Sequence, residues 1–499
     1  MGEPGPGIVS AMTTARIVFP HQLFVEHLDV DPQTLVVLVE PDLFFRQLPF
    51  HRHKLVLHRA TMRSFEERLR GAGLPTRYVA TSAERSSDDR LLDLLRAEGV
   101  TVVSIFDVVD DWLERDLRRV CREAGAELTV EETPGFLTTR EEVAQAFDDV
   151  RQPRMQHFYE RQRRRLDLLM DGDRPAGGRW SYDTENRKRL PKDVSVPDLP
   201  RATRGDHVRE ALAWVEQEFP DNPGDLATYH WPTTHRQAET WLTRFLADRF
   251  ASFGPYEDAI AADEPWLFHS VLSPLVNIGL LDPRHVVQRA VDFAEQHDVE
   301  LPSVEGFVRQ VIGWREYMRA SYVVHGRAMR TRNLLGLTRE LDESWWDGTT
   351  GLDPVDTVIR RVNRHGYAHH IERLMVLGNA MLLLRIDPDE VYEWFMTFFV
   401  DAYDWVMVPN VYAMSQFSTG ELITTKPYVS GSNYLRKMSD FGPGEWTEAW
   451  DALYWQFVAD HREGFEANPR SGFAVRTYDA MRDARKDELA ATAARWLGR

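Results

Sequence analysis

The first part of the chain alternates short apolar runs, rich in β-branched residues, with segments of helical periodicity. Five apolar runs predict strands, at residues 15–19, 35–40, 76–80, 101–106 and 127–130. Three segments between them, at 58–72, 90–99 and 112–125, carry apolar residues at helical spacing. Strands that alternate with helices are typical of a parallel sheet covered on both faces, so residues 15–135 are expected to form a Rossmann-like α/β domain.

The remainder of the chain has a helical pattern. Apolar residues recur at helical spacing over 206–219, 234–252, 283–297, 304–321, 354–365, 367–384, 387–405 and 447–464. These segments predict a large all-helical domain at 201–499. Residues 136–200 are expected to connect the two domains, and residues 1–14 to form a flexible leader.

Length, composition and charge limit the class of protein. With 499 residues, at about 100–200 residues per domain, the chain is expected to hold two or three domains. No stretch approaches the roughly 20 apolar residues of a membrane span, and the first residues lack a secretory signal, so a cytoplasmic protein without a membrane partner is expected. The formal net charge of −18 argues against indiscriminate coating of nucleic acid but leaves room for a local basic groove.

The chain has one cysteine, Cys121, and 15 tryptophans. A single thiol excludes an internal disulfide framework, a four-cysteine zinc site and a cysteine-ligated iron–sulfur cluster. Neither a G-x-G-x-x-G fingerprint nor a P-loop is present, so the predicted sheet indicates only a small-ligand crevice at the carboxyl ends of its strands. Glu40, which ends the second predicted strand, is either a contact there or an ordinary loop carboxylate.

The connector carries a basic centre. Arg161, Arg163, Arg164 and Arg165 lie on a short predicted helix, where they either face phosphate or form a solvated face paired with nearby acids. Residues 178–192 are richer in Asn, Lys, Arg and aromatic residues than a plain linker requires, and they predict a contact loop.

A serine-rich segment precedes a predicted helix that Pro274 opens. Ser270 and Ser273, with the backbone at Leu272, would present hydroxyl and N–H donors at the start of this helix. Such donors suit a phosphate or another anion, although a simple helix cap gives the same pattern.

The segment 305–332 is basic within an acidic protein. Its arginines are Arg309, Arg315, Arg319, Arg327, Arg330 and Arg332, and its acids are Glu305 and Glu316. This composition predicts a positive surface of the kind that binds phosphate groups. Trp314, beside Arg315, is either a residue that stacks on a flat heterocycle or a core tryptophan.

Two adjacent histidines, His369 and His370, point about 100° apart on a helix, so they cannot both occupy one core face. Because they diverge, they are not expected to share a metal ion, and no metal site is expected. Flanked by Arg373, they are candidates for acid–base chemistry near neutral pH.

The aromatic helix predicted at 387–405 contains Asp401 and Asp404. A buried carboxylate needs a partner, and Arg373 on the preceding helix is the expected one. Aromatic stripes are usually core, but the 15 tryptophans raise the hypothesis of electron hopping from the surface to a redox cofactor.

Six blocks of sequence carry a family resemblance. They are FGPYEDAI, HSVLSPLVNIGLL, VEGFVRQVIGWREYMR, YAHHIERLMVLGN, IDPDEVYEWF and TKPYVSGSNYLRKMS. Together they resemble the photolyase/cryptochrome superfamily, specifically its bacterial branch of iron–sulfur cryptochromes and prokaryotic (6-4) photolyases. The resemblance covers almost the whole chain and is densest from 250 to 440.

FAD is the cofactor that the resemblance implies, in a U shape within the helical domain. The residues expected near its phosphates are Ser270, Leu272 and Ser273, with Tyr256 and Asn277 nearby. Trp314 and Arg315 match a tryptophan–arginine pair that lies beside the flavin in the family. The Arg373–Asp401 pair would then brace the isoalloxazine ring, because a buried ion pair is tolerated when it also hydrogen-bonds a polar ring.

UV-damaged DNA is the partner that the resemblance implies, bound by a monomer. His369 and His370 match active-site histidines, one of which assists proton transfer at the lesion while reduced, light-excited flavin donates an electron. Tyr428 and Tyr434 match aromatic residues of the lesion pocket, which receives the damaged dinucleotide after it leaves the base stack.

The connector matches a DNA-contacting segment of the family. Arg187 lies in its loop at 180–190, and Arg161 and Arg164 are further candidate DNA contacts. Asp183 lies where the branch responds to divalent cations such as Mg²⁺.

Two further groups of residues match the family. Trp394, Trp346 and Tyr403 match a photoreduction chain that ends in a surface aromatic residue. The N-terminal domain resembles one that binds the antenna chromophore 6,7-dimethyl-8-ribityllumazine, with Glu40 as a candidate contact.

Three features depart from the branch. Related sequences place four cysteines, which hold an iron–sulfur cluster, near 352–354 and in the segment after Met438. This chain has none there, so no cluster is expected, and Phe441, Trp446 and Trp450 are expected to fill its space. Met407 stands where the resemblance suggests a polar or acidic group near the flavin N5 atom. The first strand ends in FPHQL, unlike the usual glycine-aspartate-glutamine-leucine, and Phe395 replaces a tyrosine.

The expected function is light-dependent DNA repair by a DNA photolyase, a carbon–carbon lyase, with (6-4) photoproducts favoured over cyclobutane dimers. A cryptochrome-like blue-light photoreceptor that signals by flavin photoreduction is the alternative. A DNA-damage-binding scaffold without light chemistry is a third hypothesis.

Overall fold

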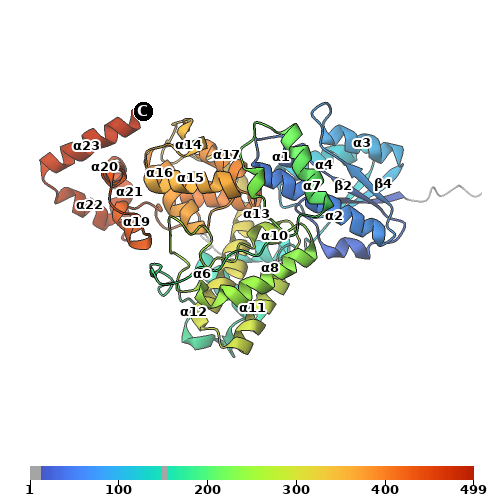
Figure 1. The fold of residues 1–499 in the computed structure, drawn as a ribbon, viewed down its shortest axis with the longest axis horizontal. Coiled ribbons are helices and arrows are strands. Elements are labelled where there is room, and N and C mark those ends of the chain that lie inside the picture. Colours follow the sequence, from blue (N-terminus) through green and yellow to red (C-terminus); the bar gives the residue numbers. More distant parts are fainter. Residues whose placement is uncertain (1–12, 149–153, 499) are drawn as a thin grey trace, which may run out of the picture.

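A five-stranded parallel sheet forms the centre of the N-terminal domain in the computed structural model, which describes residues 13–148 and 154–498 (Figure 1). In spatial order the strands are β3 (Thr76–Val79), β2 (Leu35–Val39), β1 (Thr13–Val18), β4 (Val100–Phe106) and β5 (Glu127–Glu131). The predicted strands are confirmed. The leader expected at 1–14 lies outside the described residues except for its last two positions.

Helices cover both faces of this sheet, which is why β2 is apolar and buried along its whole length. α2 (Arg52–Gly71) lies on one face, and α3 (Ser87–Ala97) and α4 (Asp111–Ala124) lie together on the other (Figure 1). The short α1 (Asp42–Phe45) follows β2, and α7 (Asp206–Glu218) packs along α2.

The connector between the sheet and the helical domain is partly helical. It contains α5 (Arg140–Asp148), α6 (Met155–Leu166) and a short hairpin of β6 (Met170–Asp171) and β7 (Arg174–Pro175). An irregular segment then leads to α7.

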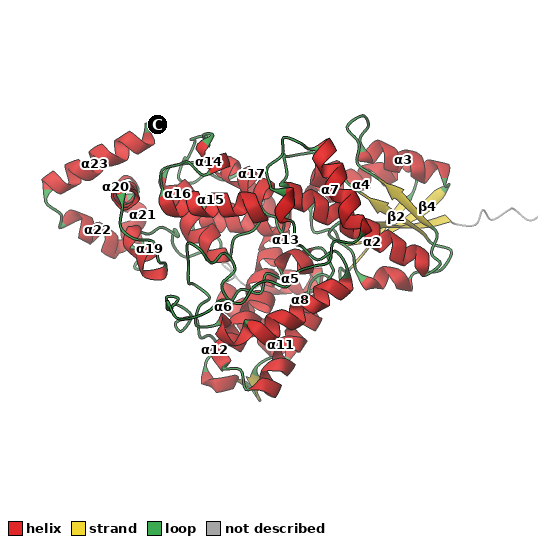
Figure 2. Cartoon of the chain, in the orientation of Figure 1, coloured by secondary structure: helices red, strands yellow, loops and turns green. Residues whose placement is uncertain are grey.

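Helices dominate the rest of the chain (Figure 2). Before residue 331 they are α8 (His235–Asp248), α9 (Phe250–Phe253), α10 (Ser273–Asn277), α11 (Pro283–His297), α12 (Leu301–Val308), the π-helical η4 (Arg309–Arg315) and α13 (Glu316–Arg330). Next come α14 (Ser344–Asp347), α15 (Asp353–His365), the π-helical η5 (Glu372–Gly378), α16 (Asn379–Leu383), α17 (Pro388–Phe398), α18 (Asp404–Val408) and the π-helical η6 (Pro409–Ser415). The last are α19 (Ser432–Met438), α20 (Glu445–Asp460), α21 (Arg462–Ala467), α22 (Gly472–Asp479) and α23 (Asp483–Leu497).

Several predicted helices are interrupted where they approach the candidate site. The helix expected at 387–405 ends at Phe398 and resumes at Asp404, so Asp401 stands in a loop between α17 and α18. Wider π-helical turns interrupt the helices around η4, η5 and η6, and such turns occur frequently at functional sites. Residue spacing alone does not reveal either kind of interruption.

Lys54 of α2 joins the sheet domain to the α17–α18 loop. Its ammonium donates to the backbone oxygens of Ala402 at 2.8 Å and Met396 at 3.3 Å. It also lies 4.6 Å from the ring centroid of Phe50. Burial lowers the pKa of Lys54 to about 7.

Four histidines, of which His51 and His53 are buried and the other two half-buried, form a second part of the interface between the sheet domain and the helical domain. His51 and His53 belong to the start of α2, His230 to the segment before α8, and His365 to the end of α15. The ring of His230 lies 6.1 Å from that of His53 and 5.6 Å from that of His365. Burial lowers the pKa of His51 and His230 to about 4 and that of His365 to about 3, so the cluster is neutral at pH 7.

Acid is therefore expected to weaken the fold between pH 6.5 and 4. In this window the unfolded histidines bind protons while the folded ones do not, so the free energy of unfolding falls as the pH falls. At pH 5, His51 and His230 should each lower it by about 2 kcal/mol relative to pH 7.5. Urea unfolding at the two pH values measures this loss.

Matched variants separate the cluster from other sources of pH dependence. His230→Phe should reduce the loss, whereas His157→Phe, at an exposed histidine of α6, should leave it unchanged. A free energy of unfolding that is equal at pH 5 and pH 7.5 would contradict the account.

Candidate functional site

A buried ion pair between Arg373 and Asp401 lies at the centre of the candidate site. The guanidinium of Arg373, in η5, contacts both carboxylate oxygens of Asp401, at 2.9 and 3.0 Å. It stacks 4.0 Å from the ring centroid of Phe399, and its Nε donates to the backbone oxygen of Ala368 at 2.7 Å. The expected pairing of Arg373 with Asp401 is present, in the two-point geometry that favours arginine.

Asp401 also binds α10. The hydroxyl of Ser273 donates to its carboxylate at 2.6 Å, and the side-chain amide of Asn277 donates to its backbone oxygen at 3.0 Å. Arg315, at the end of η4, reaches Asn277 with an Nε–Oδ1 distance of 3.4 Å. Five residues that the sequence assigns to the cofactor therefore meet in one place, which we call the Asp401 cluster: Ser273, Asn277, Arg315, Arg373 and Asp401.

The loop before α10 is strained. Val271 has a φ of 54°, a left-handed conformation that β-branched residues rarely adopt. The hydroxyl of Ser270 lies 3.4 Å from the backbone nitrogen of Leu272, as in a tight turn. Strain of this kind concentrates at ligand sites, where the surrounding structure holds an unfavourable conformation.

Arg315 carries positive charge that the protein compensates only weakly. Its nearest carboxylate, Glu316, lies 3.5 Å away and already accepts hydrogen bonds from the backbone nitrogens of Leu137 and Thr138. Burial lowers the pKa of Arg315 to about 10. A buried guanidinium whose nearest carboxylate is already engaged binds an anion such as a phosphate favourably.

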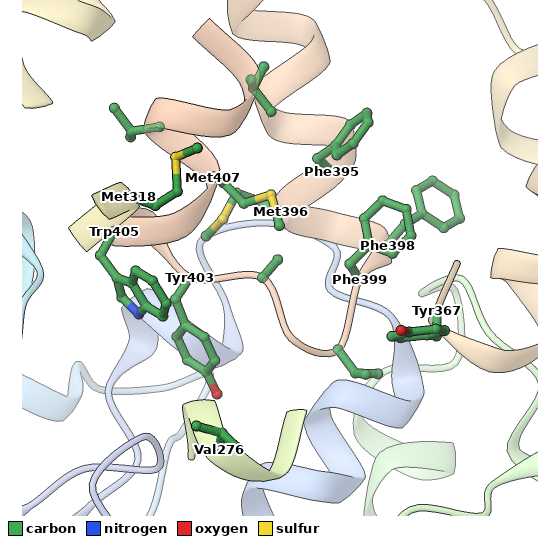
Figure 3. Close-up of a cluster of buried hydrophobic side chains, with 14 of the residues drawn as sticks. Val276, Met318, Tyr367, Phe395, Met396, Phe398, Phe399, Tyr403, Trp405 and Met407 are labelled. Carbon is green, nitrogen blue, oxygen red and sulfur yellow. The ribbon is translucent and has the colours of Figure 1, made fainter. Parts of the chain in front are cut away.

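Apolar side chains surround the α17–α18 loop (Figure 3). Figure 3 shows Met318, Met396 and Met407 together on one side of the loop and Tyr367 on the other. Met407 is buried, and a thioether neither donates a proton nor carries one. The polar group that the resemblance suggests at this position is therefore replaced by apolar packing.

Two histidines that the sequence does not link lie stacked near η5. The rings of His269 and His369 lie 4.4 Å apart with an angle of 12° between them. Both ring nitrogens of His369 and the Nε2 of His269 are buried without a hydrogen-bond partner among the described residues. Buried nitrogens without partners are costly, which indicates a place for a ligand or water.

Glu372 lies behind this pair. Its Oε2 is 3.5 Å from Nε2 of His369, and its other oxygen pairs with Arg361. Burial raises the pKa of Glu372 and lowers that of His369. Sequence reasoning missed both His269 and Glu372; the i,i+3 spacing of His369 and Glu372 is the one signal that could have identified Glu372.

His370 differs from its neighbour in exposure. Its side chain is exposed, yet the surrounding protein lowers its pKa to about 4. The divergence expected for His369 and His370 is present, with one side chain in the core and one open to solvent.

The connector loop, Tyr428 and Tyr434 form a second region. Arg187 pairs with Asp183 at 3.1 Å and approaches Asp258 at 3.6 Å. Burial raises the pKa of Tyr434 to about 12 and raises that of Tyr428, and both hydroxyls feel the charges of Asp183, Asp258 and Arg187. The expected lesion-pocket tyrosines and the expected DNA contact Arg187 are therefore close together.

A buried carboxylate of this region was not singled out from the sequence. Glu257 accepts a hydrogen bond from Asn186 at 2.9 Å and pairs with Arg309 at 3.4 Å. Burial raises its pKa to about 7 and that of Asp258 to about 6. Nevertheless, the described residues contain no group of three or more His, Cys, Asp or Glu side chains arranged to hold a metal ion.

The expectation of a positive surface over residues 305–332 is wrong. Arg309 and Arg319 are buried, and Arg319 pairs with Asp107 at 3.3 Å. Arg330 pairs with Asp404, and Arg327 pairs with Asp111 at 2.9 Å. These arginines join helices to one another, and acids distant in sequence neutralise them.

Other predicted residues lie outside the Asp401 cluster. The ring contacts of Trp314 and Tyr256 are with Tyr317 and Phe268, at 6.2 and 5.4 Å. On α6, Arg164 lies 4.4 Å from the ring centroid of Trp180. Arg161 and Arg164 are exposed, whereas Arg163 is buried and Arg165 pairs with Glu142.

An aromatic series leads from the cluster to the surface. Trp394 lies 6.0 Å from Phe399, which stacks on Arg373, and 4.5 Å from Phe398. Phe398 lies 5.3 Å from Trp346, whose side chain is 40% exposed. Tyr403 does not join this series, since its hydroxyl bonds His58 at 2.7 Å and its ring faces the sheet domain.

Glu40 is a structural residue in this conformation. Its carboxylate is fully buried and binds Arg59 at 3.2 Å, the Tyr78 hydroxyl at 2.5 Å and the Thr81 backbone nitrogen at 2.9 Å. His21, of the FPHQL segment, is also buried and contacts the backbone oxygen of Val108 at 2.9 Å. These contacts leave Glu40 no free acceptor for an antenna chromophore.

The segment after Met438 is packed with aromatic side chains. Trp446 and Trp450 are buried, with ring centroids 6.1 Å apart. Their indole nitrogens donate to the backbone oxygens of Gly442 at 3.1 Å and Ser430 at 2.9 Å. Phe441 is half-buried against the same core.

Removing one partner of the central ion pair is expected to be costly. Asp401→Ala should lower the free energy of unfolding by about 3–5 kcal/mol, because the buried Arg373 would lose its counter-charge. Urea unfolding of the protein measures the loss. Glu98→Ala, which removes the partly exposed Arg77–Glu98 pair of the sheet domain, should cost less than about 1 kcal/mol. Equal losses in the two variants would show that Asp401 has no special role.

Comparisons with known proteins add independent findings. The family model described as "Deoxyribodipyrimidine photo-lyase-related protein" matches residues 16–231, and the model described as "FAD binding domain of DNA photolyase" matches residues 307–452. A (6-4) photolyase of Agrobacterium fabrum is 34% identical over 478 residues, which cover 93% of this chain and 94% of that protein.

Solved structures share the fold. A Synechocystis cryptochrome matches with a TM-score of 0.57 at 14% identity, covering 96% of this chain and 98% of that one. A bacterial class III photolyase from Agrobacterium tumefaciens matches with a TM-score of 0.55 at 17% identity, covering 99% and 100%. Among the described residues, no helix is long and apolar enough to cross a membrane.

Proposed function

This chain belongs to the photolyase/cryptochrome superfamily, and we propose that it is a DNA photolyase that uses light and FAD to reverse (6-4) photoproducts in DNA. The resemblance drawn from its sequence blocks is confirmed. The observation that carries the proposal is the 34% identity to a (6-4) photolyase along nearly the whole of both chains. The Asp401 cluster, with the unpartnered histidines near it, supports the same activity.

The residues of the Asp401 cluster fit FAD. Arg315 has positive charge to offer a phosphate, and the hydroxyl of Ser270 with the backbone at Leu272 offers further donors, whereas the hydroxyl of Ser273 already donates to Asp401. Arg373 and Asp401 would contact the polar edge of the ring system, and Asn277 would hold the carboxylate loop in place. When bound in reduced form and excited by light, FAD supplies an electron to the lesion.

The contacts of three residues expected near FAD change the roles that we assign to them. We assign the FAD contact to Arg315 over Trp314, because Arg315 contacts Asn277, whereas the ring contact of Trp314 is with Tyr317. Met407 contributes an apolar wall, so protons at the flavin must be exchanged with another group. Tyr256 lies against Phe268, and no described contact joins it to the Asp401 cluster.

His370 is the histidine that we assign to the lesion. It is accessible and neutral at pH 7, so it can accept a proton or donate its ring N–H. His369, held between His269 and Glu372, is a positioning residue behind it. Tyr428 and Tyr434 would supply flat walls and protonated hydroxyls for the extruded base.

DNA would bind along the connector side of the molecule. Arg187, Arg161 and Arg164 are exposed there, and they supply the local positive charge that the net charge of −18 conceals. Asp183 is paired with Arg187 and Arg309. This set does not fit a Mg²⁺ site, so no step of the reaction is assigned to a cation.

We infer that the protein has neither an iron–sulfur cluster nor a lumazine antenna. A single cysteine, Cys121, buried in α4, supports a protein without an iron–sulfur cluster. The occupied carboxylate of Glu40 does not fit 6,7-dimethyl-8-ribityllumazine, and no antenna step is assigned.

We propose a cytoplasmic monomer, and size-exclusion chromatography tests the monomeric state.

A photoreceptor is the second candidate function, because the aromatic series from Trp394 to Trp346 ends at an exposed ring. Trp346 and Trp394, which both contact Phe398, can pass an electron inward from a reductant in solution, while the phenylalanine itself is not oxidised. The two functions differ in what light does to damaged DNA: a photoreceptor leaves the lesion intact.

Repair of defined lesions tests the proposed function. The protein, reduced and illuminated with blue light, is expected to restore an oligonucleotide with one (6-4) photoproduct, and to leave it unchanged in the dark. His370→Ala should lower the repair rate by about 10²–10⁴-fold while FAD absorption is retained, because the variant lacks the proton-transfer group. An oligonucleotide with a cyclobutane dimer serves as the comparison substrate. Lesions that are bound but never repaired would refute the photolyase assignment.

Photoreduction tests the aromatic series. In the FAD-loaded protein with a thiol reductant, Trp346→Phe should slow flavin photoreduction severalfold, because phenylalanine is much harder to oxidise. Trp112→Phe, at another exposed tryptophan outside the series, should have no effect. Absorption spectra during illumination provide the rates; unchanged photoreduction in Trp346→Phe would exclude this route.

A further inference from the structure

A cavity of about 360 Å³ lies between α2 and the start of α8, and it shares no residue with the Asp401 cluster. Residues of both elements line it, and Leu280 adds an apolar contact from the loop after α10. Phe65 and Leu280 are buried and form its apolar part. The cavity volume lies at the lower end of the range for small-molecule sites.

The charged groups of this cavity have one sign. Arg68 and Arg236 line it, and no carboxylate does. Both arginines are exposed, and neither side chain has an ion pair or hydrogen bond within the described part of the chain. On the same helix, by contrast, Arg63 and Arg70 pair with Glu66 at 2.9 and 2.6 Å. The chain as a whole has a net charge of −18, but these two unpaired guanidinium groups give the cavity a local positive charge.

A hydroxyl group and a helix start add to this positive character. Ser64 lines the cavity beside the arginines, as do Thr61 and Thr233, whose hydroxyls already donate to the backbone oxygen of Leu57 and to the side chain of Gln237. α8 is 14 residues long and begins at the cavity, where Thr234 accepts the backbone N–H of Gln237. The N-terminus of such a helix favours negative charge.

We propose that this cavity binds a phosphate-bearing small molecule of about mononucleotide size. Arg68 and Arg236 hold the phosphate in charge-assisted hydrogen bonds, and Ser64 supplies a further donor. The organic part lies against Phe65 and Leu280. The volume admits one nucleoside phosphate but not a second FAD.

The cavity adjoins a junction that joins the domains. His235, in its wall, contacts the backbone oxygen of Leu23 at 2.8 Å, and the backbone nitrogen of Leu23 donates to Ile278 at 3.0 Å. A ligand that bridges α2 and α8 therefore stabilises the folded protein, and mass action makes that stabilisation measurable.

Thermal unfolding of the FAD-loaded protein tests the proposal, because bound FAD excludes a nucleotide from the flavin site. The probes are adenosine 5′-monophosphate, adenosine and inorganic phosphate, each at millimolar concentration. The monophosphate is expected to raise the Tm, phosphate to raise it less and adenosine not at all. Arg68→Ala and Arg236→Ala should each weaken binding about tenfold, and the double variant should abolish the shift.

Control variants identify the binding place. Arg70→Ala, on the same helix, and Arg187→Ala, on the connector side where DNA is proposed to bind, should keep the full rise in Tm. Each variant is first checked for its Tm and FAD absorption without ligand. The proposal is overturned by equal shifts with adenosine and its monophosphate, by a shift that survives in the double variant, by loss of the shift in Arg187→Ala, or by no shift in the unmodified protein.

Discussion

The buried ion pair of Arg373 and Asp401 is the interaction on which the site depends. Two charges in a protein interior are stable only when each is compensated, and Asp401 meets this condition by binding Arg373 and Ser273 with its carboxylate. Its backbone oxygen accepts from Asn277, which ties α10 to the same loop. The end of α17 before this loop leaves Asp401 free to contact η5 through Arg373 and α10 through Ser273 and Asn277. The strained turn at Val271 leads into α10, and the aromatic series begins at Phe399 beside Arg373.

The rest of the molecule serves this arrangement from both sides. Lys54 of the sheet domain donates to the backbone oxygens of Ala402, in the Asp401 loop, and of Met396, in α17, so the sheet domain helps to hold the loop. In the segment after Met438, Trp446 and Trp450 are buried, and their indole nitrogens donate to the backbone oxygens of Gly442 and Ser430. Apolar burial and these two hydrogen bonds hold this part of the helical domain.

Much of this could be predicted from the sequence, because period and composition report on local structure. The parallel strands follow from apolar runs, and the pairing of Arg373 with Asp401 follows from the cost of a buried charge. The break between α17 and α18 and the stack of His269 on His369 were not predictable, because they arise from contacts between distant segments. The arginines of 305–332 were misinterpreted for the same reason: spacing shows that they are numerous, but not that distant acids neutralise them.

A crystal structure of the protein with FAD tests the central claim most directly. The account predicts that the Arg373–Asp401 pair stays intact, with its N–O distances close to 3 Å, and that the polar edge of the isoalloxazine ring contacts this pair. The phosphates should lie near Arg315 and the Ser270–Ser273 turn. A flavin bound elsewhere, or a pair separated by the ring, would contradict the account.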